Sequence, residues 1–235
     1  MHQEQRETMV DQERLVHARL RAEHVASSYF ARHPDFRLAA KVHDGTLSLT
    51  EAYEILVQSA RDPKTDVQRA DLLGEVMEYE MYHTRQVGHP FSVAVFDIDD
   101  FKAINQELTH VTADDVLKEV ATIIADTVRG SDGVLPGDEG SVVRWGGEEF
   151  VVILTGADRD QAHQAADRIR QRVQQELTGR RPQGKPVTVS GGLVEFSPDT
   201  IGDWKTLLKT ADQQLLAAKE SGKNIIFPSA ESAAA

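Results

Sequence analysis

The sequence predicts an α+β fold in which a helical N-terminal region precedes a domain built around a mixed sheet. Two observations predict this arrangement. Apolar residues recur at helical spacing in the first third of the chain, and segments typical of strands and helices alternate from residue 91 onward. The length of 235 residues and the apolar fraction of 40% are sufficient for a sizeable buried core.

Three proline-containing breaks divide the first ninety residues. Helices are expected over 1–31, 48–60 and about 66–87, and the breaks are His33-Pro34, Asp62-Pro63 and Gly88-His89-Pro90. We expect residues 1–69 to form a helical regulatory or dimerisation region. The second domain then occupies 70–228, and the small-residue tail 229–235 is expected to be flexible.

From residue 91 the expected elements follow the order β-α-β-β-α-β, and a further α-β pair ends the chain. Strands are expected at 91–98, 142–145, 150–154, 186–196 and 224–227, and helices at 101–107, 112–129, 159–177 and 203–221. A Gly-Gly-Glu-Glu turn joins the two middle strands as a hairpin. The first six elements match the ferredoxin-like unit, so we expect an α+β domain of that type.

Composition excludes several classes of protein. The net charge is −12, of which residues 1–70 carry −1 and the remainder −11, so the domain repels a nucleic-acid backbone and we expect no nucleic-acid partner. No apolar run approaches ~18 residues, and the polar N-terminus does not fit a secretory signal. We therefore expect a soluble, cytoplasmic protein that does not enter a membrane. The chain has no cysteine, which excludes disulfides and thiolate metal sites.

Carboxylates gather at two places in the expected sheet. Asp97 and Asp99 end the strand 91–98, and alternation places them on one face. Glu148 and Glu149 lie on the hairpin turn, and we expect the first strand to lie beside the hairpin strand that follows the helix. Converging acids repel one another unless a cation neutralises them, which favours a magnesium site that carries a polyphosphate. Gly146 and Gly147 leave room for a ligand at the turn; alone, such a turn is more often a solvated hairpin.

Five segments together resemble one known family. RWGGEEF (144–150) resembles the signature of the GGDEF family of diguanylate cyclases in its glutamate variant. FDIDDFKAIN, THVTAD, VTVSGG and ADQQLLAAKESGKN resemble further family motifs in the same order. The resemblance covers roughly residues 70–227 and implies a nucleotide-cyclase-type fold of the ferredoxin-like class.

The resemblance implies a reaction and a set of roles. The family condenses two GTP into cyclic di-GMP with release of two pyrophosphates, in a homodimer in which each domain binds one GTP. The resemblance implies that Asp97, the Ile98 carbonyl and Glu148 bind Mg²⁺, with Mn²⁺ as an alternative metal. Asp99 and Glu149 are weaker candidates for metal ligands. Glu148 also accepts the 3′-hydroxyl proton, and Lys102 stabilises transition-state charge. The remaining substrate contacts are Asn105, His110 and Asp114 at guanine and ribose, and Lys219 and Lys223 at the terminal phosphates.

The chain departs from the family at several positions. The D-x-L-T-G-L-x-N-R stretch, aligned with residues 70–78, retains only Leu72 and Gly74, and Glu78 replaces its arginine. This puts the dimer geometry and the rate in question. Arg129 and Asp132 match the R-x-x-D motif through which the product inhibits many relatives. In this chain the motif lies eight residues earlier, relative to the Gly-Gly-Glu-Glu signature, than in the family. We therefore expect inhibition through that site to be weak or absent.

Two other functions stay open on the sequence. A degenerate domain could bind GTP or a guanine dinucleotide and regulate a partner without turnover, and the altered 70–78 segment motivates this alternative. The other alternative is a scaffold protein, in which the helices mediate assembly and the domain is inert. An inert scaffold, however, has no need to retain the full set of candidate site residues, which are Asp97, Lys102, Asn105, Asp114 and Glu148.

Overall fold

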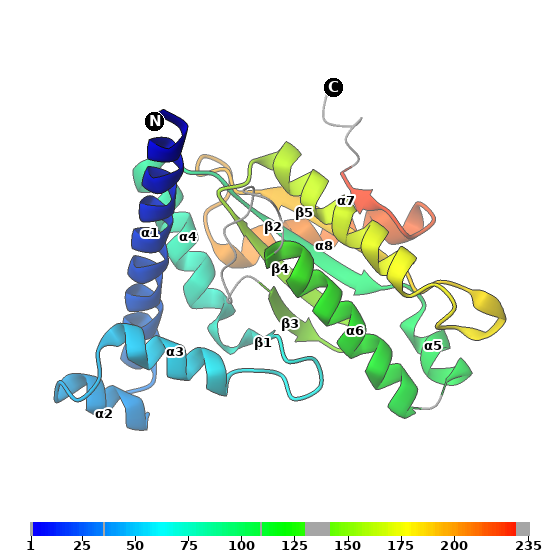
Figure 1. Cartoon of the computed structure of the whole chain (residues 1–235), viewed down its shortest axis with the longest axis horizontal. Helices are drawn as coiled ribbons and strands as arrows, with labels where there is room; N and C mark the ends of the chain where they lie inside the picture. The colour runs from blue at the N-terminus through cyan, green and yellow to red at the C-terminus, as the bar shows by residue number, and fades with distance from the viewer. Residues whose placement is uncertain (1, 35, 109, 130–141, 229–235) are drawn as a thin grey trace.

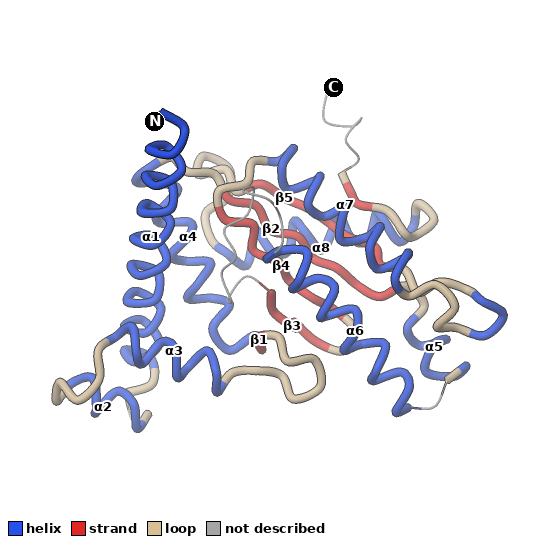
Figure 2. Tube along the Cα trace, in the orientation of Figure 1, coloured by secondary structure: helices blue, strands red, loops and turns tan. Residues whose placement is uncertain are grey.

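The computed structural model describes residues 2–34, 36–108, 110–129 and 142–228. Its described part contains a mixed sheet of six strands with helices on both faces (Figures 1 and 2). The strand order is β1-β3-β4-β2-β5-β6. Their bounds are β1 Gln68–Arg69, β2 Phe91–Ile98, β3 Val142–Gly146, β4 Glu149–Thr155, β5 Val189–Glu195 and β6 Ile226–Phe227. The α+β fold class is confirmed.

Strand β2 lies at the centre of the sheet and pairs antiparallel with both β4 and β5. The expected neighbour was the hairpin strand that directly follows the helix, and this is wrong, because β3 lies beyond β4. The connection from β2 to β3 skips one place in the sheet, and β4 returns antiparallel into the gap. The register nevertheless places Asp97 opposite Glu149, so the two acidic segments still meet.

Alternate residues of β2 face two separate layers of core. Ala94 and Phe96 pack with helices α6 (His110–Arg129) and α7 (Arg159–Glu176). Val93 and Val95 pack on the other side with α4 (Leu73–Val87) and α8 (Trp204–Glu220). Because both faces of the strand are covered, its sequence is almost continuously apolar. The short helix α5 (Phe101–Glu107) follows the end of β2.

The N-terminal helices pack onto α4 and extend the core on that side. These are α1 (His2–Arg32), α2 (Arg37–His43) and α3 (Leu49–Ser59), and in Figure 1 α1 runs alongside α4. A buried ion pair joins Arg21 to Glu80 at 3.2 Å. Ser48 and Glu51 form a capping box that begins α3, the helix expected over 48–60. Helix α2 was not expected; its Leu38, Ala39 and Val42 pack against the same core.

The third helix begins later than predicted, at Leu73 rather than near residue 66. Residues 68 and 69 instead pair in parallel with Val143 and Arg144 as the edge strand β1, and a single 3₁₀ turn spans Ala70–Leu72. Gly74 is buried against α8, where an added Cβ would lie 3.2 Å from Trp204 Cζ2. None of the described helices combines the length and the apolar character needed to cross a bilayer.

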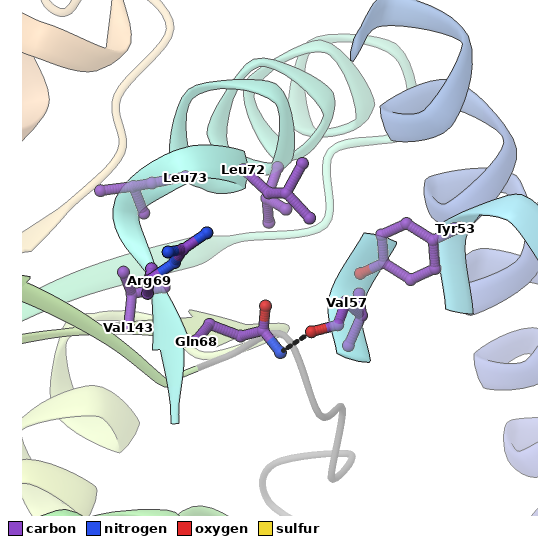
Figure 3. Close-up of a pocket in the computed structure, with 8 residues that line it drawn as sticks. Tyr53, Val57, Gln68, Arg69, Leu72, Leu73 and Val143 are labelled. Carbon is purple, nitrogen blue, oxygen red and sulfur yellow. Dashed lines mark hydrogen bonds between the residues drawn. The ribbon is translucent and has the colours of Figure 1, made fainter. Parts of the chain in front are cut away.

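A small pocket lies between α3, the start of α4, and the strands β1 and β3 (Figure 3). Apolar side chains line most of it, and Gln68 Nε2 donates to the Val57 carbonyl at 3.1 Å across its floor. The pocket contains none of the residues predicted to bind the nucleotide. It therefore marks the contact between the N-terminal helices and the edge of the sheet rather than a substrate site.

Candidate functional site

The acidic end of β2 meets the C-terminal part of α8. Lys219 Nζ lies 2.5 Å from Asp97 Oδ1, 3.1 Å from Asp99 Oδ1 and 3.5 Å from the Ile98 carbonyl oxygen. The Ile98 amide is 3.4 Å from the Glu148 carbonyl, which places the hairpin turn against the same strand end. The structure thus brings Asp97, Ile98, Glu148, Glu149 and Lys219 together, although they come from three separate segments.

The electrostatics of this end of the sheet favour a bound cation. Burial raises the pKa of Asp97, and the charges of Glu148 and Asp99 add to the increase, while the bond from Lys219 opposes it. Burial also raises the pKa of Glu149, and Asp97 and Asp212 add to that increase. The acids therefore resist sharing the site in their charged form, and a cation between them relieves this repulsion.

The fit to a metal ion is partial in this arrangement. Among the residues that the structure describes, no group of three or more histidine, aspartate or glutamate side chains is arranged to hold a metal. The Lys219 ammonium instead contacts oxygens of Asp97 and Ile98, the two predicted ligands from β2. These are hard oxygen donors, the type that magnesium and manganese prefer. A divalent ion would therefore have to take the place of the ammonium.

Asp99 is a buried structural carboxylate rather than an open ligand. Its side chain accepts from Thr188 Oγ1 at 2.8 Å and from Ser190 Oγ at 2.7 Å, and the Asn224 amide donates to it at 3.0 Å. Asp99 thereby joins the end of β2 to β5 and to the turn after α8. This turn carries Lys223, so Asp99 positions the site, and its Oδ1 also lies 3.1 Å from Lys219 Nζ.

The two candidate phosphate-binding lysines are each paired with an acid at the end of β2 or directly after it. Lys223 Nζ lies 2.6 Å from Asp100 Oδ1, and this bond lowers the pKa of Asp100 and raises the pKa of Lys223. Lys219 holds Asp97 as described above. Lys102 lies on α5 and is exposed. The ammonium groups of Lys219 and Lys223 are therefore gathered at one end of the sheet.

The Gly-Gly-Glu-Glu turn is held by an arginine that sequence reasoning did not select. Arg144 donates to the Gly147 carbonyl from Nε at 3.0 Å and from Nη2 at 2.7 Å. Its Nη1 donates to Asp62 Oδ1 at 2.9 Å. Gly147 has a φ of +42°, a backbone conformation that is strained for a residue with a side chain. A Cβ added at Gly146 would meet no other atom within 4 Å. Arg144 therefore holds the turn, and the space beside its two glycines is open.

Asp62 also organises a tight turn. Its Oδ1 accepts hydrogen bonds from Lys64 N, Thr65 N and Thr65 Oγ1 at 3.1, 2.9 and 2.8 Å. Asp66 then adopts a φ of +60°. This geometry favours a different alignment of the D-x-L-T-G-L pattern, in which Asp62 and Thr65 match and Asp66, with its positive φ, stands in the place of the glycine. Read this way, the pattern begins at residue 62, and the signal was present in the letters D-P-K-T.

The residues predicted to contact the base lie on α5 and α6. Asn105 is half-buried on α5. Asp114 lies on α6, and both of its carboxylate oxygens are 2.9 Å from Lys64 Nζ. The side chains of His110 and Arg129, and the whole of Asp132, lie outside the described residues, so the product-inhibition expectation stays a prediction.

Comparison with known proteins agrees with this geometry. The family model described as "Diguanylate cyclase, GGDEF domain" matches residues 59–225, which begins before the boundary that we placed at residue 70. The chain is 32% identical over 164 residues to diguanylate cyclase DosC of Escherichia coli (strain K12), a match that covers 69% of this chain and 34% of the relative. The chain therefore spans about a third of the length of the curated relatives it matches.

Two solved structures share the fold. The GGDEF domain of DgcB from Caulobacter crescentus, in complex with c-di-GMP, is 26% identical with a TM-score of 0.61, over 72% of this chain and 92% of that one. Diguanylate cyclase SiaD from Pseudomonas aeruginosa, in complex with its activator SiaC, is 26% identical with a TM-score of 0.63, over 96% and 86%. The sequence motifs, the sheet order and these matches lead to one conclusion: the chain belongs to the GGDEF family of diguanylate cyclases.

Proposed function

We propose that this chain condenses two molecules of GTP into cyclic di-GMP, as a homodimer that requires a divalent metal. The observation that carries the proposal is the meeting of Asp97 and the Glu148-Glu149 turn with Lys219 at one end of the sheet. The relatives named as diguanylate cyclases support the reaction class. We place the reaction in the cytoplasm, where GTP is available.

In the proposed reaction some side chains neutralise the charge of the phosphates and others position the nucleotide. Asp97, the Ile98 carbonyl and Glu148 would hold Mg²⁺ or Mn²⁺, which supplies neutralisation of phosphate charge when bound. Lys219 and Lys223 then leave their carboxylates for the terminal phosphates, and Lys102 faces the charge that builds up in the transition state. Asn105, His110 and Asp114 orient the guanosine. The open surface at Gly146 and Gly147 admits the triphosphate against the turn.

The chemistry requires two copies of the domain. The 3′-oxygen of one GTP attacks the α-phosphorus of the other, the new P–O3′ bond forms, and the bond to the β-phosphate breaks with release of pyrophosphate. Glu148 accepts the 3′-hydroxyl proton. The 3′-oxygen of the second nucleotide then attacks the α-phosphorus of the first, which closes the ring and releases the second pyrophosphate. Each domain therefore supplies one nucleotide. Two identical sites facing one another provide this symmetry.

The test is product analysis by chromatography with mass detection. Purified chain is incubated with GTP and Mg²⁺, and with ATP in a parallel mixture. We expect cyclic di-GMP from GTP, and its loss in Glu148→Ala. Asp160→Ala changes an exposed acid at the start of α7 and should leave turnover intact. Full activity in Glu148→Ala would show that the site is wrongly assigned.

A second function is favoured by one observation. Lys219 and Lys223 are already neutralised by Asp97 and Asp100, so the site is closed on itself as it stands. A domain that binds GTP and signals to a partner without turnover would look the same. The solved complex of SiaD with an activator is a relative in which a partner is bound. GTP that stays intact yet binds in a titration would favour this function, or activation through the N-terminal helices.

A further inference from the structure

Lys64 and Asp114 form an ion pair that joins the turn before β1 to helix α6. Lys64 Nζ lies 2.9 Å from Asp114 Oδ1 and 2.9 Å from Oδ2. An ammonium placed equally between both oxygens occupies the position from which a ligand with two adjacent N–H donors would approach the carboxylate. Lys64 is therefore located in the part of the site that the proposed function gives to guanine.

The backbone of Lys64 is fixed, whereas its ammonium is free to move. Asp62 accepts from the Lys64 amide at 3.1 Å, and Arg144 ties Asp62 to the Gly147 carbonyl of the hairpin turn. The side chains of Lys64 and Asp114 are 52% and 48% exposed. Ion pairs of such exposure contribute little to stability, so the pair opens at small cost when a ligand arrives. The long stem of Lys64 allows its ammonium to move by a few ångströms without a change in the backbone.

Guanine presents the complementary groups in a row. Its N1–H and N2–H donors lie beside the O6 acceptor, and Asp114 can accept from both donors. An ammonium displaced from between the two carboxylate oxygens then lies next to O6, the group that lysine recognises on guanine elsewhere. Adenine presents an amino group at the same position, and a donor facing a cation is unfavourable. The same contact therefore attracts one purine and rejects the other.

We propose that Lys64 is a specificity-determining residue of the base site, which donates to O6 of guanine while Asp114 accepts from N1 and N2. This inference rests on the proposed function, because it takes Asp114 as the residue that contacts guanine. It extends that function to a residue from the turn that precedes the sheet.

The experiment measures binding without turnover. 3′-Deoxy-GTP and 3′-deoxy-ATP lack the attacking hydroxyl, so their Kd values with Mg²⁺ can be obtained by titration of the intact chain. We expect Lys64→Met to lower the preference for guanine over adenine about tenfold, the usual value of one good contact to a base edge. Lys64→Arg should retain most of the preference. Lys118→Met, which removes an exposed ammonium one turn further along α6, should change neither Kd.

A second probe isolates O6. The 6-thio analogue of 3′-deoxy-GTP replaces only the C6 oxygen with a poorer acceptor. The wild type should bind it more weakly than the oxygen form, and Lys64→Met should lose most of that difference. Comparing both proteins with both nucleotides separates the contact from the larger size of sulfur.

Several results would overturn the inference. Equal Kd values for Lys64→Met and the wild type would show that the ammonium does not contact the base. Tighter binding of both nucleotides by Lys64→Met, at an unchanged ratio, would show that Lys64 only obstructs the site. If the wild type binds neither nucleotide, the proposed function fails first and the inference fails with it. Binding by the wild type with no effect of Lys64→Met rejects the inference alone.

Discussion

Lys219 Nζ lies 2.5 Å from Asp97 Oδ1 and so occupies the place where the family resemblance predicts a metal ion. The same ammonium is 3.5 Å from the Ile98 carbonyl, the second predicted ligand. An ammonium and a divalent ion compete for the same oxygens, Asp97 Oδ1 and the Ile98 carbonyl oxygen. The lysine that binds phosphate in the proposed mechanism is thus also the group that stabilises the acids before nucleotide binds.

Lys219→Met tests this competition. Without the ammonium, Asp97 and Ile98 are open to a cation, so we expect Mn²⁺ alone to bind more tightly than to the wild type in a titration followed by electron paramagnetic resonance. The same variant should bind the triphosphate more weakly, by about tenfold for the loss of one charged hydrogen bond. Lys209→Met, an exposed lysine on the same helix, is the matched control. Weaker Mn²⁺ binding by Lys219→Met would show that the ammonium does not compete.

Asp97→Asn should separate stability from activity. Burial and the neighbouring acids raise the pKa of Asp97, so its charged form is disfavoured in the folded chain. We therefore expect the variant to melt at the same or a higher temperature than the wild type while cyclic di-GMP formation is lost. Calorimetry and product analysis on one preparation give both readings. A lower melting temperature with residual turnover would place Asp97 in a structural role.

Asp99→Asn should have the opposite profile. Asp99 accepts three hydrogen bonds from Thr188, Ser190 and the Asn224 amide, and it is 3% exposed. An amide nitrogen cannot accept, so one or more donors lose their partner at a cost of about 2–4 kcal/mol in the free energy of unfolding. Urea denaturation measures this loss. Asp100→Asn changes the exposed acid next to it and should stay within about 1 kcal/mol.

Asp62→Asn tests whether the turn before β1 supports the signature hairpin. Burial opposes the charge on Asp62, yet its bonds from Thr65 and Arg144 hold the pKa of this carboxyl below its ordinary value. We expect a loss of about 1–3 kcal/mol in the free energy of unfolding and reduced turnover, because the neutral amide oxygen of asparagine accepts from Arg144 more weakly than the carboxylate does and holds it less firmly beneath Gly147. Asp66→Asn in the same turn is the control, since Asp66 is 78% exposed and asparagine tolerates its positive φ.

The contact between α1 and α4 should weaken on mild acidification. Burial and the charge of His17 lower the pKa of His83 below 6.5, so the folded chain favours the neutral ring. A group with a depressed folded pKa contributes stability above its unfolded pKa and loses it as pH falls through the folded value. Melting temperatures from pH 7.5 to 5 should therefore fall, and less steeply for His83→Gln than for the wild type. Identical slopes would remove His83 as the cause.

The pH effect has a second, more acidic component at the same contact. Burial opposes the charge on Glu80, but hydrogen bonds from His17 and Arg21 lower its pKa below 4.5. Its stabilisation is present above 4.5 and is lost only as pH falls through the lower folded value. The two components therefore separate on the pH axis, and His83→Gln should alter only the upper one.

The sequence by itself determined the class of the fold and the family to which the chain belongs. Local signals were sufficient for this: the apolar run of β2, the helical spacing of apolar residues in α6, and the order of motifs around Asp97 and Glu148. Such features depend on neighbours within a few residues, so they can be recognised in the letters alone.

Only the tertiary structure decided which of these residues meet. The parallel pairing of Gln68 with Val143 turned a predicted stretch of helix into β1, because pairing across the sheet outweighs local propensity. It also brought Lys64 to Asp114 and Arg144 to Asp62, pairs separated by 50 and 82 residues. Contacts at such separations depend on the sheet order and on packing from both faces. No local pattern contains that information, and so the groups that surround the predicted site became visible only in the folded chain.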